Sequence, residues 1–343
     1  MNSLETLLIA DDKPGHYHLS EGVIAALERV VDIKLTRMNV KRHWWAPGRL
    51  LSYLSNNKVS DKIILKFGYD IRIEDLPAAD LVISAGGNTL AANIVATRAL
   101  GADNIFIGSL RRFPPEDFNL VITSFERLAH LPRHLVCLKP NKLDPDTLNH
   151  PDQPARFGND TPPVTAGLLL GGNTPQFKYT DEEWQKCADF IDISYQRWGT
   201  KWLVSNSRRT PDKVSDLFSK RAAHSDSPIT FIDYRHAGPG SLHRIFETAN
   251  IILCTEDSST MISEAIAAQL PVVGLVPDIH QFTPQEKEYR QYLQQNNWTK
   301  SISLATLDLE ILNQKLSQII PMKENHLDIL AEKLKQRLPD LLT

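Results

Sequence analysis

The residues best suited to chemistry lie in the stretch Glu256–Pro271, which reads EDSSTMISEAIAAQLP. The apolar run Ile251–Cys254 precedes it, and a helical pattern that carries Glu264 follows its acidic and hydroxyl residues. Because a helix N-terminus presents free backbone N–H groups, such a strand, turn and helix start together predict an anion site. Glu264 stands among apolar neighbours, so its carboxylate needs partners, either the hydroxyls of a ribose or a structural arginine. We expect a nucleotide-sugar site here, with Glu256 and Asp257 in turn and cap roles.

Two more polar loops follow apolar runs in the same half of the chain, one reading Gly-Gly-Asn and the other Ser-Asn-Ser-Arg-Arg-Thr-Pro. Glycines allow the backbone to approach a diphosphate closely, and paired arginines supply guanidinium groups for its oxygens. Thr210 and Asp257 also suit plain N-caps, with Pro211 as the first helical residue. Capping does not account for two cations at a helix start, where the dipole disfavours them. The predicted donor-binding residues are Gly172, Asn173, Ser207, Arg208, Arg209, Ser258, Ser259 and Glu264.

In the first half of the chain, Asp11, Asp12 and His16 follow the apolar run Leu7–Ala10. An inverting glycosyl transfer needs a base that takes the proton of the acceptor hydroxyl as the sugar arrives. Either Asp12 or His16 would serve, and these two are the predicted catalytic residues. A lone loop histidine is more often a plain surface residue, so His16 is chosen for its position.

Two further segments of the first half are candidates for binding an acceptor. One places basic residues around a Trp pair, which suits a membrane interface or an amphipathic acceptor. The alternative is that these tryptophans pack in the core. The other is a Gly-Gly-Asn turn that offers backbone hydrogen bonds, or is only a tight strand–helix connection. The predicted acceptor-binding residues are Trp44, Trp45, Gly86, Gly87 and Asn88.

Alternating strand and helix patterns must position these loops, and their spacing predicts parallel β-α-β units. Residues 139–163 hold six of the 21 prolines and show neither helical nor strand periodicity, as in a linker between domains. We therefore expect an α/β protein with two Rossmann-like domains facing a central cleft, over residues 1–150 and 164–321. The apolar C-terminal pattern, 322–343, is expected to form a helix that crosses back to the first domain. Ligands of such sheets bind at the carboxyl ends of the strands.

Composition narrows the function classes. The chain has 343 residues, a formal net charge of −3 and 42% hydrophobic residues, so no excess of positive charge points to nucleic acid. Three scattered cysteines do not suit a disulfide framework, and Cys137 and Cys254, which end apolar runs, predict buried, reduced thiols and a cytoplasmic location. We find no basic leader, no apolar stretch of membrane-spanning length, no metal-binding motif and no phosphate-binding glycine motif of the nucleotide-hydrolase or dehydrogenase type.

The chain resembles the family named for the plant mitochondrial-fission factor elongated mitochondria, which has many bacterial members. The matching segments are Asp12–His16, Ser205–Pro211 and Asp257–Ala265, and their order and spacing extend over nearly the whole chain. That family is similar to GT-B glycosyltransferases, including the peptidoglycan N-acetylglucosaminyltransferase. The resemblance implies a donor site in the second domain, with Glu264 near the ribose, and an acceptor site in the first, with His16 near the reaction centre. The chain differs from the family pattern at Gly86–Asn88 and at the glycine-rich loop Ala237–Ser241.

The sequence thus predicts a metal-independent GT-B glycosyltransferase whose substrate is a nucleotide-sugar and which uses no cofactor. The expected acceptor is a cell-envelope glycolipid or lipopolysaccharide core, met by peripheral contact at the inner membrane. Two alternatives stay open: a nucleotide-sugar 2-epimerase of the same fold, and a non-catalytic fission-type interaction protein. The sequence does not fix the oligomeric state.

Overall fold

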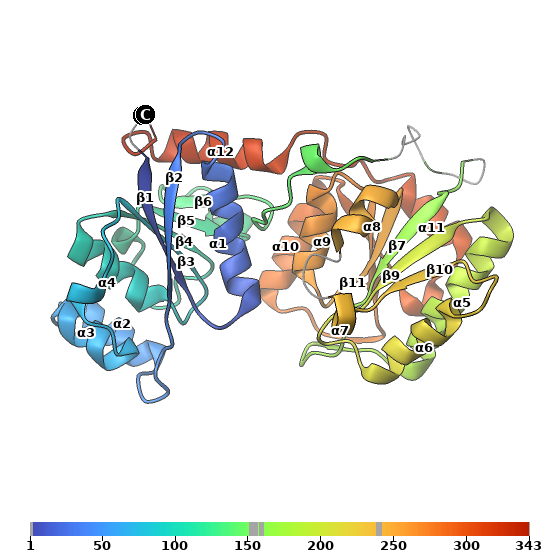
Figure 1. Ribbon diagram of the computed structural model, residues 1–343, viewed down its shortest axis with the longest axis horizontal. Coiled ribbons are helices and arrows are strands. Elements are labelled where there is room, and N and C mark those ends of the chain that lie inside the picture. The colour runs from blue at the N-terminus through green and yellow to red at the C-terminus, as the bar shows by residue number, and fades with distance from the viewer. Residues whose placement is uncertain (1–2, 151–156, 158–160, 238–241, 343) are drawn as a thin grey trace. The chain divides into compact units, whose positions relative to one another are not determined.

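A computed structural model describes residues 3–150, 157, 161–237 and 242–342. The chain divides into two α/β units: unit 1 comprises Met1–Lys142 together with His326–Thr343, and unit 2 comprises Leu143–Asn325 (Figure 1). The division falls inside the segment expected to be a linker. Residues 151–156 and 158–160 of that segment, and 238–241 of the expected glycine-rich loop, lie outside the described residues.

Unit 1 is built on a six-stranded parallel sheet with strand order β2-β1-β3-β4-β5-β6. Its central strands β3 and β5 are fully buried and largely apolar, as expected where both faces are covered, whereas the edge strand β2 is polar and mostly exposed. The order reverses direction at β1, so the loops after β1 and β3 leave neighbouring strand ends at the carboxyl edge. The strands are β1 (Leu4–Ala10), β2 (Ile33–Asn39), β3 (Leu81–Ala85), β4 (Asp103–Ile107), β5 (Leu120–Thr123) and β6 (His134–Val136).

The alternation of side chains along β1 assigns the helices of unit 1 to the two faces of the sheet. Leu4 and Leu8 belong to the core cluster that contains α1 and α12, whereas Leu7 and Ile9 belong to the cluster of α2, α3 and α4. The helices are α1 (Pro14–Leu27), α2 (Gly48–Asn56), α3 (Asp61–Tyr69), α4 (Leu90–Leu100) and α12 (His326–Arg337).

The C-terminal helix α12 completes the core of unit 1. Its apolar residues Leu327, Leu330 and Leu334 are buried against Val23 and Leu27 of α1. Figure 1 shows α12 lying across one end of α1 in the part of the chain that also holds β1. A helix therefore lies within the predicted segment 322–343 and packs on the first unit, but it is shorter than predicted and spans His326–Arg337.

Unit 2 repeats the architecture with a second six-stranded parallel sheet, of order β10-β9-β7-β11-β12-β14. Its strands are β7 (Thr165–Leu169), β9 (Lys201–Ser205), β10 (Ile229–Ile232), β11 (Ile251–Thr255), β12 (Val272–Val276) and β14 (Thr299–Ser303). Its helices are α5 (Asp181–Trp198), α6 (Asp212–Ala222), α7 (Tyr234–Ala237), α8 (Leu242–Thr248), α9 (Ser259–Ala267), α10 (Pro284–Gln295) and α11 (Leu309–Leu316). A short antiparallel pair, β8 (Phe177–Lys178) and β13 (Ile279–His280), stands beside it.

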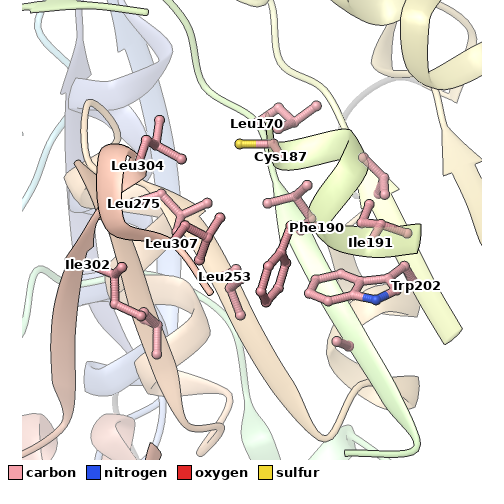
Figure 2. Packing of buried hydrophobic residues seen from close by; sticks show 14 of the residues in the cluster. Leu170, Cys187, Phe190, Ile191, Trp202, Leu253, Leu275, Ile302, Leu304 and Leu307 are labelled. Carbon is pink, nitrogen blue, oxygen red and sulfur yellow. The ribbon is translucent and has the colours of Figure 1, made fainter. Parts of the chain in front are cut away.

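The core of unit 2 lies between α5 and the sheet. Figure 2 shows Phe190 of α5 and Trp202 of β9 packed against each other, with Leu253 of β11 nearby. The two rings meet edge to face with their centroids 6.1 Å apart, and the indole N–H of Trp202 donates to Ser194 Oγ at 2.8 Å. A buried indole that keeps its hydrogen bond adds apolar area without an unsatisfied donor. This core fixes the strands whose carboxyl ends carry the predicted donor loops. The prediction of buried free thiols at Cys137 and Cys254 is also confirmed, and Cys187 is buried and free as well.

Candidate functional site

In unit 2, the buried carboxylate of Asp257 joins the three predicted donor loops. Asp257 follows β11, and its Oδ2 accepts hydrogen bonds from the backbone N–H of Gly172 at 3.0 Å and from Nη2 of Arg209 at 2.7 Å. The hydroxyl of Tyr179 lies 3.3 Å from the other carboxylate oxygen. The loops after β7, β9 and β11 therefore meet at one carboxyl edge, as parallel pairing of these strands requires.

The capping interpretation of these loops was wrong in both places. The N-cap of α6 is Pro211, and the Thr210 hydroxyl instead donates to the carbonyl of Leu170 at 2.9 Å. The N-cap of α9 is Ser258, without a side-chain capping bond. Asp257 stands one residue too early to cap, and its carboxylate is directed towards Gly172 and Arg209 instead. Both side chains therefore hold loops together across the sheet edge.

The neighbouring loops give Gly171 and Gly172 a structural reason to be glycine, besides the predicted approach of a diphosphate. A Cβ on Gly171 would lie 2.3 Å from the Asp257 carboxylate oxygens, and one on Gly172 would lie 2.0 Å from the carbonyl oxygen of Arg209. Side chain and backbone of the neighbouring loops fill both spaces. Asn173 and Ser207 also serve the loops, because Asn173 Oδ1 accepts from the Tyr179 N–H at 2.8 Å and Ser207 Oγ donates to the Gly171 carbonyl at 3.2 Å. Ligand contact by Gly172, Asn173 and Ser207 stays a prediction.

The two adjacent arginines differ in what holds them. Arg209 forms an ion pair with Asp257, whose side chain is fully buried, while the Arg209 side chain stays 45% exposed. Arg208 is exposed and has no hydrogen bond or ion pair from its side chain within the described part of the chain. The Asp257 carboxylate thus holds the Arg209 side chain in place and neutralises part of its positive charge. Arg208 is the guanidinium that retains its full capacity for an anion.

Glu256 lies in the turn after β11, as the sequence predicted, but its side chain also forms a buried ion pair that the sequence did not predict. Its buried carboxylate pairs with Nε of the buried Arg290 of α10 and accepts from Ser301 Oγ at 2.7 Å. Arg290 also donates from Nη2 to the Glu256 carbonyl at 2.9 Å. A Cβ on Gly274 would lie 2.0 Å from Glu256 Oε1, so β12 carries a glycine beside this pair. Arg290, 34 residues away in the sequence, was not predicted. Its pair with Glu256 ties the turn before α9 to α10 and β14.

Glu264 stands on α9, one to two turns after the helix start. It is only partly exposed, and its carboxylate has no hydrogen bond or ion pair to any residue that the structure describes. Burial raises the pKa of the Glu264 carboxyl to about 7. The structural arginine that the sequence left open as a partner is absent among the described residues, because Arg290, the buried arginine nearby in the fold, pairs with Glu256. Glu264 is therefore a desolvated acceptor without a donor.

The start of α9 leads into this position. Ser258 is buried and its Oγ lies 3.4 Å from Oγ1 of Thr260, while Ser259 is the first helical residue. The side chain of Ser258 does not cap the helix, and a helix start carries a positive partial charge that suits an anion. Ser258, Ser259, Arg208 and Glu264 thus line one edge of unit 2.

In unit 1, the loop after β1 contains a paired carboxylate and imidazole. Nδ1 of His16 lies 2.8 Å from Oδ2 of Asp11, which is buried, and the His16 side chain is 30% exposed. Asp11 also accepts from the Lys13 N–H at 3.2 Å. Asp12, the other predicted catalytic residue, is exposed and has no side-chain bond to any described residue. Sequence reasoning placed Asp11 in this loop but missed its pairing with His16.

The predicted Gly86–Asn88 turn encloses this pair. Gly86 has a φ of +85°, and a Cβ there would lie 2.2 Å from His16 Nδ1, so only glycine fits both the backbone and the ring. Asn88 donates from Nδ2 to Asp11 Oδ2 at 3.2 Å, and its backbone carbonyl accepts from the Tyr69 hydroxyl at 2.8 Å. The side chain of Asn88 therefore fixes the Asp11–His16 pair. Acceptor contact by this turn stays a prediction.

Trp44 and Trp45 do not pack in the core, so that alternative was wrong. Trp44 is 86% exposed and Trp45 48% exposed. The Trp45 ring stacks on His43 with centroids 4.2 Å apart, and Trp44 meets Trp45 edge to face at 5.8 Å. Single exposed apolar side chains are normal on a protein surface, but two adjacent exposed indoles form a contiguous apolar surface.

A model of the family described as "Mitochondrial fission ELM1" matches residues 14–338. The chain belongs to the mitochondrial fission ELM1 family. The resemblance drawn from three short segments is thereby confirmed over nearly the whole chain. No curated protein sequence matches this ELM1-family chain.

Solved structures identify the fold of the ELM1-family chain. MurG from Acinetobacter baumannii is 11% identical, with a TM-score of 0.52, over 97% of this chain and 99% of that one. The UDP-GlcNAc 2-epimerase from Methanocaldococcus jannaschii is 14% identical, with a TM-score of 0.56, over 98% and 100%. MnaA from S. aureus, solved with UDP, is 12% identical, with a TM-score of 0.53, over 99% and 98%. The fold is GT-B, as the sequence predicted.

Two features are absent from the described residues of this ELM1-family chain. Within them, no helix is long and apolar enough to cross a membrane. The same residues contain no group of three or more His, Cys, Asp or Glu side chains arranged to hold a metal ion.

Proposed function

We propose that the chain is a glycosyltransferase that moves a sugar from a nucleotide-sugar bound by unit 2 to an acceptor bound by unit 1. The unpartnered carboxylate of Glu264 carries this proposal. A carboxylate that is desolvated and lacks a donor costs stability, and the two hydroxyls of a ribose would supply paired hydrogen bonds to it. The uncapped start of α9 and the unpaired Arg208 supply the complementary groups for the diphosphate.

The Asp11–His16 pair supports a role in the transfer itself. Because Nδ1 of His16 bonds to the Asp11 carboxylate, the proton of the neutral ring belongs on Nδ1 and Nε2 is left as a base. In the proposed step, Nε2 of His16 takes the proton of the acceptor hydroxyl, and the oxygen of that hydroxyl bonds to the anomeric carbon of the donor sugar. The bond from that carbon to the diphosphate breaks with inversion, and the diphosphate leaves with the electron pair. Arg208 and the α9 N-terminus balance the charge that develops on it, so the proposed step needs no cofactor.

Nucleotide binding is the first test. Calorimetric titration with UDP, GDP, ADP and CMP should show binding of at least one of them, and UDP is the first choice because the S. aureus MnaA and the M. jannaschii epimerase structures contain it. Glu264→Gln should weaken that binding. Silence from all four nucleotides in folded protein would remove the transferase proposal and leave the non-catalytic interaction protein.

A nucleotide-sugar 2-epimerase is the second candidate, because the M. jannaschii epimerase is as similar in fold as MurG. The two reactions differ in their need for an acceptor. Incubation with UDP-N-acetylglucosamine alone would yield the 2-epimer if the chain is an epimerase. A transferase leaves the sugar configuration unchanged until an acceptor is added.

For the acceptor, we propose a cell-envelope glycolipid reached by peripheral contact with the inner membrane. The exposed Trp44 and Trp45 support it, since indoles prefer the membrane–water interface. In a vesicle co-sedimentation assay, Trp44→Ser/Trp45→Ser should reduce binding several-fold. Tyr195→Ser, which removes an exposed aromatic side chain from unit 2, is the matched control. Equal binding of the Trp double variant and wild type would contradict the membrane contact.

A further inference from the structure

Unit 1 contains a cavity of about 500 Å³ that neither the catalytic pair nor the Trp pair accounts for. We call it the arginine pocket. Its wall combines the loop before α2 with the loop after β3 and the loop after β4, all at the carboxyl edge of the sheet. It is lined by Pro47, Gly48, Arg49, Gly87, Arg111, Arg112 and Phe113.

Three exposed arginines line this pocket, and no carboxylate is among its lining residues. The side chains of Arg49, Arg111 and Arg112 make no ion pair or hydrogen bond with any residue within the described ranges. Most other arginines of unit 1 do have carboxylate or carbonyl partners, for example Arg98 with Asp117 and Arg37 with Glu21. Like charges gathered in one cavity repel each other, and the chain as a whole is negative, so the local excess is specific to this place.

The backbone conformation of Arg111 supports a binding role for its side chain in the pocket. Arg111 has a φ of +56°. The other non-glycine residues with positive φ that the structure describes all follow the end of a helix, where that conformation is common: Lys58, Asp70, Gln269 and Asn297. Arg111 lies in the loop after β4 instead, and a non-glycine residue there stores strain of about 1 kcal/mol or more. Strained residues of this kind cluster at ligand-binding and active sites, so the conformation of Arg111 supports a binding role for the pocket.

Gly87 shows what Arg111 packs against. A Cβ on Gly87 would lie 2.5 Å from Cζ of Arg111, so the guanidinium lies flat over the glycine. The backbone of Gly87 has no positive φ, which leaves this contact as the reason for glycine. The neighbouring Gly86 contacts the His16 ring in the same way. Two consecutive residues of one turn, Gly86 and Gly87, therefore contact the proposed base and an arginine of the pocket.

We propose that the arginine pocket binds a phosphate group of the acceptor, so that the acceptor is a phosphorylated saccharide. Guanidinium groups bind phosphate through paired hydrogen bonds, and three of them match a doubly charged group better than a single carboxylate. The cavity is larger than one phosphate requires, and Pro47 and the buried Phe113 offer apolar contacts to an attached sugar. The identity of the ligand as acceptor rests on the proposed transferase function. Phosphate binding by the pocket does not.

The test measures phosphate binding with the donor site blocked. Inorganic pyrophosphate and glucose 6-phosphate are titrated calorimetrically into the full-length protein at saturating UDP. Wild type should bind at least one of the two probes, with affinity that falls as salt rises. Arg111→Ala/Arg112→Ala should weaken binding at least tenfold. Lys34→Ala/Arg72→Ala removes two positive charges of unit 1 outside the pocket and should change it less than twofold.

Gly87→Ala provides a variant that retains every charge. The added methyl group displaces the Arg111 guanidinium without backbone strain, so binding should weaken about fivefold while circular dichroism stays unchanged. Hydrogen exchange should slow at residues 47–51 and 108–114 when pyrophosphate is added. Unchanged affinity in both Gly87→Ala and the Arg111/Arg112 variant would overturn the proposal, as would failure of wild type to bind either probe.

Two further comparisons complete the test. The first shows whether the phosphate belongs to a lipid or to a soluble saccharide, and the second shows which of the two proposals fails if one does. Binding to vesicles with phosphatidic acid but not to glucose 6-phosphate would place the phosphate on a lipid; the reverse would place it on a soluble saccharide. In either case phosphatidylcholine vesicles should not compete. If no nucleotide binds but the pyrophosphate signal is lost in Gly87→Ala, the transferase function fails and the phosphate site stands. If UDP binds and neither pyrophosphate nor glucose 6-phosphate does, the opposite holds.

Discussion

His16 and Arg111 lie against consecutive glycines of one turn. A Cβ on Gly86 would meet Nδ1 of His16 at 2.2 Å, and a Cβ on Gly87 would meet Cζ of Arg111 at 2.5 Å. The turn after β3 thus sets the imidazole and the guanidinium at a fixed separation, one on each residue. The proposed base and the proposed phosphate ligand are therefore positioned by the same two backbone units.

Removal of His16 should abolish most of the transfer. General base catalysis contributes about 10²–10⁴-fold, so His16→Ala should lower kcat by that factor with little change in nucleotide affinity. Asp11→Asn should also lower kcat, because the amide cannot hold the proton on Nδ1. The measurement is steady-state transfer at saturating donor.

Asp12→Asn decides between the two catalytic residues that the sequence left open. Asp12 is exposed and carries no side-chain bond to a described residue, so its loss should change kcat by less than about threefold. If Asp12→Asn is inactive and His16→Ala is active, the base has been assigned to the wrong residue.

Glu264 should make both stability and nucleotide affinity depend on pH. Its pKa is raised from 4.5 to about 7, so the folded state binds more protons than the unfolded state between these values. Stability should therefore fall as pH rises through that window, by at most about 1.4 kcal/mol per pH unit, and level off above it. Denaturant titrations at pH 5, 6, 7 and 8 measure this slope, which should be smaller in Glu264→Gln.

The same titration of Glu264 governs binding, because only the carboxylate accepts both ribose hydrogen bonds. Nucleotide affinity should rise between pH 6 and pH 8 in wild type and stay flat in Glu264→Gln. A pH-independent affinity in wild type, with Glu264→Gln binding equally well, would exclude the ribose contact.

Arg208 and Arg209 should separate binding from stability. Arg208→Ala should weaken nucleotide binding about tenfold, as loss of a charge-assisted hydrogen bond does, and leave the melting temperature unchanged. Arg209→Ala leaves the buried Asp257 carboxylate without its cation and should cost about 1–3 kcal/mol of stability. Calorimetric titration and thermal denaturation measure the two effects. Equal melting temperatures of the two variants would contradict the structural role of Arg209.

The Glu256–Arg290 pair should be a stability element of unit 2. Arg290→Met leaves a buried carboxylate unpaired and should cost about 3–5 kcal/mol. Glu256→Gln/Arg290→Met should recover part of that loss, since no charge is then left uncompensated. Guanidinium chloride unfolding checks both variants. A double variant that is less stable than Arg290→Met alone would show that the pair acts through more than its charges.

The sequence predicted elements best where local chemistry marks their ends. The apolar periodicity predicts a helix over Asp181–Trp198, and α5 has these bounds, because Thr180 and Glu183 form a capping box and Gly199 ends the helix in the left-handed conformation. Helix α10 was missed because its buried face is narrow: only Tyr289, Arg290 and Leu293 are buried in an otherwise polar segment. Helix α2 was missed because the preceding Trp pair was interpreted for its surface chemistry.

The candidate site was predictable as a set of loops and not as a set of contacts. Parallel strand ends meet at one edge, so the position of Asp257 near Gly172 and Arg209 follows from the order of strands. Whether a side chain faces a ligand or joins two loops depends on contacts between residues that are far apart in the sequence. Glu256 and Arg290 are 34 positions apart, and Gly87 and Arg111 are 24 positions apart. A single sequence carries no local signal for such pairs. Capping was predicted at Thr210 and Asp257 because only the local pattern was visible.

The place of α12 in the core of unit 1 sets an order for synthesis on the ribosome. Every strand and helix of unit 2 lies before Asn325 and is synthesised before α12. The apolar face of α1 is covered only when Leu327, Leu330 and Leu334 have been synthesised. Domains fold as units while the chain emerges, usually the N-terminal one first. Here the N-terminal sheet is made first but its core is closed last, so unit 2 can reach its native state while unit 1 still exposes the surface that α12 will cover. Nascent chains that end before α12 should be the form that chaperones bind.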